Sequence, residues 1–224
     1  MKPSLYSVLY TIVSNIAVGL CFIPVLLLFW KKMRREKAYR MVAIYWLATG
    51  LINLPTFYLF EHFALQEELA LLYNLLDTPL LLLVFYYAAS RRDHKKHILT
   101  TLLLFIALES ALLLWKGTNF NSSTMIIGAG LLLILTYSIS GLVQYMRNME
   151  HTPFENSMVF VYAALLFAYG SFMIIYIFNH FHSTHGSSRD SMLLYYIGLF
   201  FSSAITCMGL LGFGMRSVHS SSSS

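Results

Sequence analysis

Apolar residues occupy long uninterrupted blocks of this chain, and short polar segments separate the blocks. Blocks of about 18 or more apolar residues with few charges are typical of transmembrane helices. The strands of a membrane barrel would show alternating polarity over about ten residues, a pattern that no segment has. Because backbone groups in lipid need hydrogen-bond partners within their own segment, the blocks predict an all-α polytopic membrane bundle. We place seven spans at residues 5–30, 39–60, 69–89, 98–115, 124–146, 158–178 and 192–215.

Lysine and arginine gather in the segments that follow the odd-numbered spans. Six of them lie in residues 31–40 and four in residues 91–96, while Arg147 and Arg216 follow the fifth and seventh spans. The opposite side of the membrane receives only three basic residues. Because basic residues are retained on the cytoplasmic side, this bias predicts an N-terminus outside and a C-terminus in the cytoplasm.

The composition agrees with a chain that lies mainly in lipid. Hydrophobic residues make up 58% of the sequence and charged residues 11%, against about 25% charged residues in a soluble domain. The net charge of +5 comes from the basic cytoplasmic segments, so nucleic acid is not implied as a partner. We expect one seven-helix domain over residues 1–216 and a disordered Ser-rich tail over residues 217–224. The lipid bilayer of a cell membrane is the expected partner, and it is the cytoplasmic membrane if the source is bacterial.

Two acidic residues fall inside predicted spans, Asp77 in the third and Glu109 in the fourth. A charge at membrane depth costs at least about 2.5–3.5 kcal/mol, so such residues mark functional sites by default. Tyr73 and Asn74 precede Asp77 by one helical turn and share its face, and Pro79 frees a carbonyl nearby. The alternative for Asp77 is a neutral side chain bonded to a neighbouring helix. The alternative for Glu109 is a side chain that reaches the headgroup region from a short span.

Polar side chains from six of the predicted spans lie at a common depth. Counted from the outer ends, they fall about 9–16 Å below the outer surface, while the inner half is more uniformly apolar. Such a layer predicts a polar cavity that opens outward and binds a small molecule or lipid. The alternative is hydrogen bonding between helices, which needs no ligand. The members are Asn15, Asn53, Asp77, Glu109, Tyr169, Ser202 and Ser203, and with Tyr73 and Asn74 they make up the predicted ligand-binding residues.

The cysteine and histidine residues predict neither a disulfide nor a metal site. Cys21 and Cys207 fall inside apolar blocks and are expected to be buried free thiols. Residues 179–185 on the outer side hold three histidines, and residues 61–62 add a Glu-His pair. Their spacing fits no established zinc motif, so histidines exposed on a loop are the simpler interpretation.

Residues 77–83, Asp-Thr-Pro followed by four leucines, resemble part of the third helix of microbial rhodopsins. In that family the acid lies further before the Thr-Pro pair. Residues 167–169, Phe-Ala-Tyr, are loosely similar to the aromatic wall of the retinal pocket. The resemblance implies the seven-helix architecture. Retinal, however, attaches to a lysine of the last helix, where residues 202–207 hold none, and no lysine lies within any span. The resemblance therefore implies neither covalent retinal nor light-driven pumping, and no other cofactor is predicted.

A second comparison is with intramembrane hydrolases similar to alkaline ceramidases and adiponectin receptors. These seven-helix proteins hold a zinc ion on the cytoplasmic side with three histidines, an aspartate and a serine. In this chain no histidine lies inside a predicted span and no His-x-x-x-His sequence occurs. Asp77 alone does not make that site, so this resemblance does not carry an activity over.

Three functions remain open on the sequence. A transporter or channel for a small solute, ion or lipid follows from the outer polar layer and Asp77, although the apolar inner half offers no continuous path. A ligand-sensing receptor that signals through a membrane-protein partner fits an outward cavity closed below, although no segment is long enough for an output domain. A lipid-modifying enzyme with Asp77 or Glu109 as acid or base lacks an evident nucleophile. We take binding or transport as the leading hypothesis and catalysis as the less favoured one.

Overall fold

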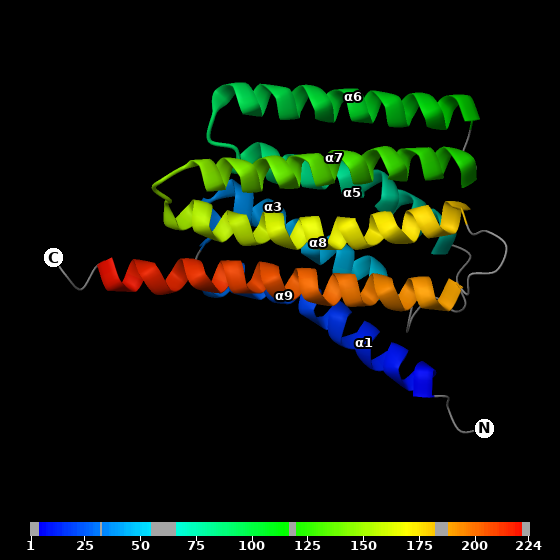
Figure 1. Ribbon diagram of the computed structural model, residues 1–224, viewed down its shortest axis with the longest axis horizontal. Coiled ribbons are helices and arrows are strands. Elements are labelled where there is room, and N and C mark those ends of the chain that lie inside the picture. Colours follow the sequence, from blue (N-terminus) through cyan, green and yellow to red (C-terminus); the bar gives the residue numbers. More distant parts are fainter. Residues whose placement is uncertain (1–4, 32, 55–65, 117–119, 182–187, 221–224) are drawn as a thin grey trace. The chain divides into compact units, whose positions relative to one another are not determined.

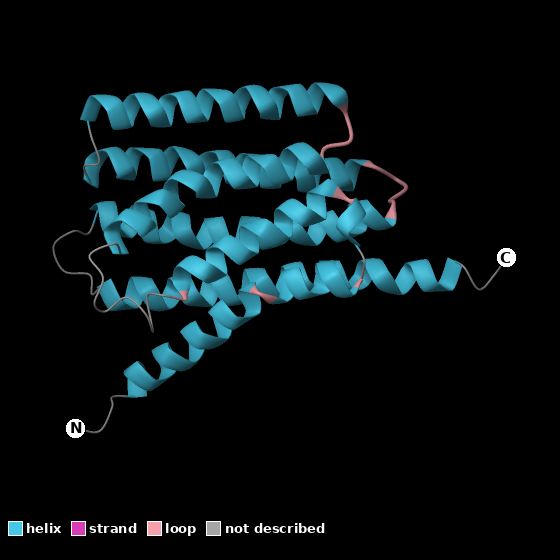
Figure 2. Cartoon of the chain, turned by 180° about the vertical axis from the view of Figure 1, so that it is seen from behind, coloured by secondary structure: helices cyan, strands magenta, loops and turns pink. Residues whose placement is uncertain are grey.

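The structure is a computed structural model that describes residues 5–31, 33–54, 66–116, 120–181 and 188–220. Within these ranges every regular element is a helix (Figure 1), and short loops join the helices (Figure 2). The predicted all-α class is therefore confirmed for the described residues. The elements are α1 (Leu5–Cys21), α2 (Ile23–Trp30), the 3-10 helix η1 (Met33–Arg35), α3 (Lys37–Asn53), α5 (Gln66–Ala88), α6 (Arg92–Lys116), α7 (Phe120–Arg147), α8 (Pro153–Phe181) and α9 (Ser188–Ser220).

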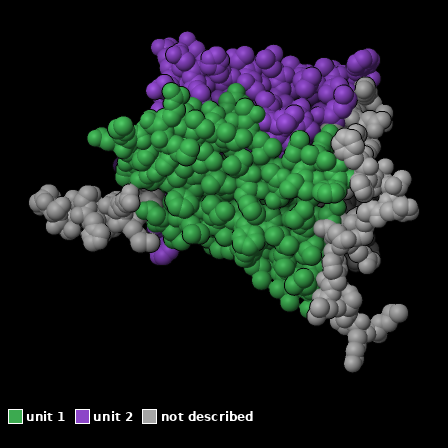
Figure 3. Space-filling view, viewed as in Figure 1, with its two compact units in different colours: residues 1–27, 135–224 green, residues 28–134 purple. Residues whose placement is uncertain are grey.

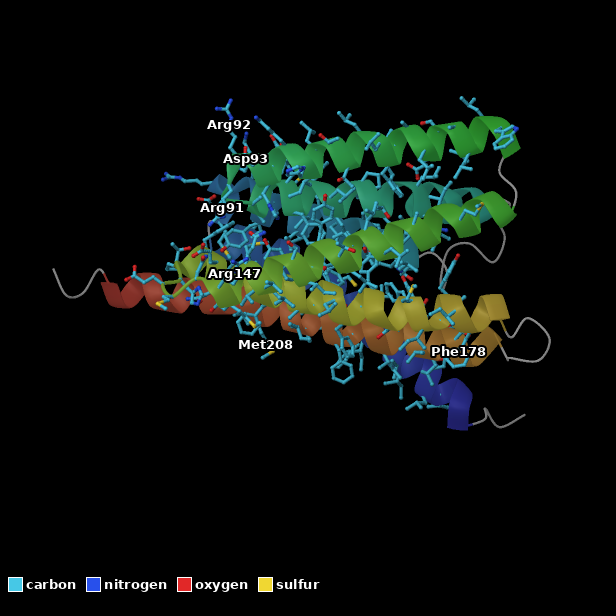
Figure 4. All side chains as sticks on the ribbon, turned by 45° about the horizontal axis from the view of Figure 1, so that its top comes forward. Arg91, Arg92, Asp93, Arg147, Phe178 and Met208 are labelled. Atoms are coloured by element: carbon cyan, nitrogen blue, oxygen red, sulfur yellow. The ribbon has the colours of Figure 1, made fainter. Side chains whose placement is uncertain are left out.

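Five segments of the described chain are long and apolar enough to cross a membrane. They are Val8–Trp30, Arg92–Trp115, Met125–Arg147, Pro153–Phe178 and Ser191–Gly212. Many large apolar side chains on them are exposed, such as Leu114 on α6 and Met208 on α9, which points away from its helix (Figure 4). These features indicate a multi-pass membrane protein. The predicted spans at 39–60 and 69–89 are not among the five, so the count of seven and the orientation remain predictions.

The first predicted span is divided at Phe22. Pro24 has no N–H to donate to the preceding turn, so the helical ladder is interrupted there. The amide of Phe22 donates to the carbonyl of Gly19 at 3.3 Å, and the amide of Leu26 then donates to the carbonyl of Phe22 at 3.3 Å. Pro79, in contrast, lies inside α5 without ending it. A proline in an apolar block therefore breaks one helix of this chain and leaves another continuous.

The helices do not end where the predicted spans end, as α3, α6 and α9 show most clearly. The helix α3 ends at Asn53, and residues 55–60 of the predicted second span lie outside the described residues. The helix α6 begins at Arg92, before the predicted span at 98–115, because its charged first turns continue the helix beyond the apolar block. The helix is thus longer than the predicted fourth span. The helix α9 continues to Ser220, into the segment predicted as a tail, and residues 221–224 lie outside the described residues.

The chain divides into two compact units (Figure 3). Unit 1 comprises Met1–Leu27 and Leu135–Ser224, and unit 2 comprises Leu28–Ile134. Unit 1 therefore holds α1, α8, α9 and the second half of α7. Unit 2 holds η1, α3, α5, α6 and the first half of α7.

In unit 1, α9 packs against both α8 and α1. The contacts are aromatic and close. The rings of Tyr10 on α1 and Tyr196 on α9 meet edge to face with centroids 5.7 Å apart. Gly209 of α9 lies so near α8 that an added Cβ would stand 2.6 Å from the Cβ of Phe160 and 2.9 Å from the carbonyl oxygen of Ser157. Contacts between aromatic rings and close packing of the helix backbones hold α1, α8 and α9 together.

In unit 2, α3 and α5 pack antiparallel along most of their length. The ammonium group of Lys37 lies 5.7 Å from the ring centroid of Tyr87, and the hydroxyls of Thr49 and Tyr73 are 3.1 Å apart. These pairs join opposite ends of the two helices, so together they fix the register. The helix α5 also packs against α6.

Basic residues gather at one end of unit 2. Arg91 and Arg92 stand with Asp93 where α5 passes into α6 (Figure 4). Lys37, at the start of α3, contacts Tyr87 at the end of α5 and therefore belongs to the same end. The polar pair Thr49 and Tyr73 lies towards the other end. Unit 2 thus has a basic end and, towards the opposite end, a polar contact between helices.

Candidate functional site

A set of polar side chains lies where α3 and α5 meet in unit 2. We call it the α3–α5 cluster. It consists of Thr49, Asn53, Tyr73, Asn74 and Asp77. Thr49 and Asn53 are buried, and the three residues of α5 are partly exposed. The cluster therefore combines polar side chains from two helices of an apolar unit.

The hydrogen bonds of the cluster fix which groups donate. The hydroxyl of Thr49 donates its single proton to the carbonyl of Tyr45 at 3.0 Å, so the hydroxyl of Tyr73 is the donor in the 3.1 Å contact with Thr49. The side-chain amide of Asn53 donates to the carbonyl of Thr49 at 2.8 Å. The oxygens of Tyr73 and Asn53 can then act only as acceptors. The cluster therefore places several acceptor oxygens where α3 and α5 meet.

Asp77 and Asn74 extend the cluster deeper along α5. Asp77 follows Tyr73 by four residues and Asn74 by three, so one face of the helix carries all three side chains. The Oδ1 atom of Asp77 is buried. The carboxyl group therefore adds a further, partly buried acceptor to the cluster.

Glu109 lies on α6 of the same unit. Its side chain is only 7% exposed, and its Oε1 atom is buried without a hydrogen-bond partner among the described residues. A glutamate that reached the headgroup region would expose its carboxyl group. The structure therefore does not support the alternative in which Glu109 reaches out to the membrane surface.

Two of the four predicted residues of unit 1 form hydrogen bonds within their own helix. Ser202 and Ser203 are fully buried and donate to the carbonyls of Leu199 at 3.2 Å and Phe200 at 3.0 Å, which belong to their own helix. The ring of Tyr169 is buried on α8, with its centroid 5.4 Å from that of Phe172. Asn15 is exposed on α1.

The structure thus brings Tyr73 and Asn53 together through Thr49. Asn53, Tyr73, Asn74, Asp77 and Glu109 belong to unit 2, whereas Asn15, Tyr169, Ser202 and Ser203 belong to unit 1. An outward cavity lined by all nine residues remains a prediction.

The sequence analysis missed Thr49, which links the two helices of the cluster. A signal was present, because Thr49 precedes Asn53 by four residues and so shares its helical face. It also missed Ser138 and Ser157 of unit 1, whose buried hydroxyl oxygens have no hydrogen-bond partner in the described part of the chain.

Both cysteines are free and buried, as predicted. No group of three or more histidine, cysteine, aspartate or glutamate side chains that could hold a metal ion occurs among the described residues. The histidine run at 179–185 and the pair at 61–62 lie outside the residues whose side chains are described.

Comparison with known proteins adds no relative, since no family model, curated protein or solved structure matches this chain. The resemblance to microbial rhodopsins therefore remains a prediction from the third span. The function has to be argued from the residues themselves.

Proposed function

We propose that this chain is a seven-span membrane protein that binds a small solute in its outer half and transports it across the membrane. The N-terminus lies outside and the C-terminus in the cytoplasm. Five apolar helices support a multi-pass protein. The basic end of unit 2 supports the orientation, because its arginines and Lys37 lie where the cytoplasmic surface is proposed.

The hydrogen bond between Thr49 and Tyr73 carries the proposal. It joins α3 to α5 away from the basic end of unit 2, with Asn53 one turn along α3 and Asp77 one turn along α5. A hydroxyl pair is sufficient to hold two membrane helices together. An acid on the next turn is not needed for that purpose and costs at least about 2.5–3.5 kcal/mol at membrane depth. Retention of Asp77 beside the pair therefore favours a ligand.

The donors and acceptors of the cluster indicate the kind of solute. The protons of Thr49 and Tyr73 are committed to bonds within the protein, as is one amide proton of Asn53. The oxygens of Tyr73, Asn53 and Asp77 are hydrogen-bond acceptors. A solute that donates hydrogen bonds or carries positive charge complements this set.

The substitution Asp77→Asn tests the proposal. Native mass spectrometry of the purified full chain would show whether a small molecule co-purifies and whether the variant loses it. We expect the wild type to retain the molecule and the variant to lose it. The matched control is Asp93→Asn, which removes an exposed acid from the start of α6 and should leave binding unchanged.

Transport in reconstituted vesicles and thermal stability in detergent complete the test. If Asp77→Asn leaves binding, transport and stability all unchanged, Asp77 is not part of a site and the proposal fails.

A further inference from the structure

Glu109 lies on the buried stripe of a helix whose other faces are largely exposed. The stripe consists of Ile98, Leu102, Phe105 and Glu109, each at most 7% exposed, and their spacing keeps them on one face of α6. Large leucines such as Leu103 and Leu104 cover the exposed faces. Because α6 packs against α5, the acid lies on the packing side of the helix rather than on its lipid side.

The carboxyl group of Glu109 is buried without a compensating hydrogen bond at Oε1, among the residues that the structure describes. An ionised carboxylate in apolar surroundings is too costly to persist alone. Its charge must be balanced either by a proton or by a bound cation. Concealment from lipid explains why the side chain points inward, but it does not explain why an acid is present.

The register of α5 and α6 places Glu109 near the level of the α3–α5 cluster along the helix axis. The two helices are joined through residues 89–91 and pack side by side, so they run antiparallel. Glu109 lies 17 residues after Arg92, the first residue of α6. Counting 17 residues back from Ala88, the last residue of α5, gives position 71, which is therefore at the same level along the two helices. Tyr73 is then about 3 Å deeper along the axis and Asp77 about 9 Å deeper.

The groups at this level are acceptors. Tyr73 gives its proton to Thr49, so its oxygen can only accept. The other titratable side chains described on α5 are Asp77, which is deeper, and two tyrosines near the basic end. The described side chains of α7 in unit 2, residues 125–134, include no titratable group. Nothing described on these two helices supplies a positive charge to Glu109.

We propose that Glu109 and the polar face of α5 form a binding site for a small monovalent cation. This inference rests on the proposed function and names the class of its solute or coupling ion. Carboxylate and phenol oxygens are hard ligands, and the single charge of one carboxylate is balanced by one monovalent cation. Calcium would need six to eight oxygens and usually several carboxylates, whereas Glu109 is the one carboxylate that the structure describes at this level of α5 and α6. In the absence of the cation a proton neutralises Glu109, and binding of Na⁺ releases that one proton to solvent.

Thermal unfolding of the full chain in detergent tests the site. The midpoint is measured in sodium, lithium or potassium chloride and in N-methyl-D-glucamine chloride, whose cation is too large, at constant ionic strength. Because a ligand of the native state stabilises it, we expect a small cation to raise the midpoint of the wild type. Glu109→Gln should need at least tenfold more cation for the same rise. Asp93→Asn, an acid exposed on the same helix, should behave like the wild type.

A second measurement uses the wild type alone, in case Glu109→Gln does not fold. A hydrophobic carbodiimide modifies protonated carboxyl groups in apolar surroundings, and mass spectrometry of peptides locates the product. We expect modification of Glu109 without small cations and protection in their presence. Equal midpoints in all four salts would overturn the proposal. So would an unchanged cation response in Glu109→Gln, no modification at Glu109, or modification that cations do not reduce.

The outcomes separate this inference from the proposed function. If Asp77→Asn loses the co-purified molecule but the wild type shows no cation response, the solute site is supported and the cation site is refuted. If the cation response depends on Glu109 but Asp77→Asn changes nothing in any assay, the solute site is refuted. The cation site is then separate from Asp77.

Discussion

The predicted site residues differ between the two units in how their polar side chains bond, although unit 1 also has a hydrogen bond between helices, from Tyr145 on α7 to Asn156 on α8 at 2.6 Å. In unit 1 the hydroxyls of Ser202, Ser203 and Thr206 donate to carbonyls of their own helix. In unit 2 the hydroxyls of Thr49 and Tyr73 bond to each other across two helices, near Asp77. A polar group satisfied within its helix costs little in lipid and has little capacity left for a ligand. A group that bonds between helices fixes their register and positions its neighbours, so unit 2 is the better place to search for chemistry.

The largest effect that we expect on stability comes from the packing of unit 1. At Gly209 an added methyl group would collide with the Cβ of Phe160 and with the backbone carbonyl of Ser157, neither of which can rotate away. Gly209→Ala should therefore lower the free energy of unfolding by about 1–3 kcal/mol. Reversible unfolding in mixed detergent micelles, followed by tryptophan fluorescence, measures the change.

Gly212 supplies the matched control, because it lies on the same helix with nothing within 4 Å of an added Cβ. Gly212→Ala should be neutral, or stabilising by up to about 1 kcal/mol through the better helix propensity of alanine. Equal effects of the two substitutions would show that α8 and α9 do not pack through Gly209.

A smaller effect tests the bond between the helices of unit 2. Thr49→Val removes the acceptor of Tyr73, and Tyr73→Phe removes the donor. A double-mutant cycle should give a coupling energy of about 0.6 kcal/mol and at most about 1.7 kcal/mol, the mean and the maximum measured for hydrogen bonds between membrane helices. The same unfolding assay on the wild type, both single variants and the double variant provides the four values. A coupling near zero would remove the bond that anchors the α3–α5 cluster.

Much of the fold follows from the apolar blocks, because a segment in lipid has few alternatives to a helix. Two exceptions, the polar first turns of α6 and the two prolines, show features of the helices that the apolar blocks do not predict. Arg92 to His97 are charged or polar, yet they continue α6, since water satisfies their side chains while the backbone stays helical. Pro24 interrupts a helix and Pro79 does not. A missing donor has the same local chemistry at both positions, so the surrounding packing decides the result.

The sequence predicted four of the five members of the α3–α5 cluster but neither Thr49 nor the contacts between members. Asp77, Asn74 and Tyr73 share a face by spacing alone, and that inference needs only one helix. The contact of Tyr73 with Thr49 depends on how α3 is positioned against α5, which the spacing within either helix does not determine. Burial of Glu109 is likewise a tertiary property, because its spacing from Phe105 and Leu102 becomes meaningful only when α5 covers that stripe.

The smallest effect is expected for Ser202→Ala in unit 1. Ser202 is fully buried, and loss of a buried hydrogen bond to a neighbouring helix would cost as much as Thr49→Val. Its hydroxyl, however, donates to the carbonyl of Leu199 in the same helix. We therefore expect a change in unfolding free energy within about 0.5 kcal/mol, because alanine also favours the helix. A loss equal to that of Thr49→Val would mean that Ser202 bonds beyond α9, and the contrast between the two units would no longer hold.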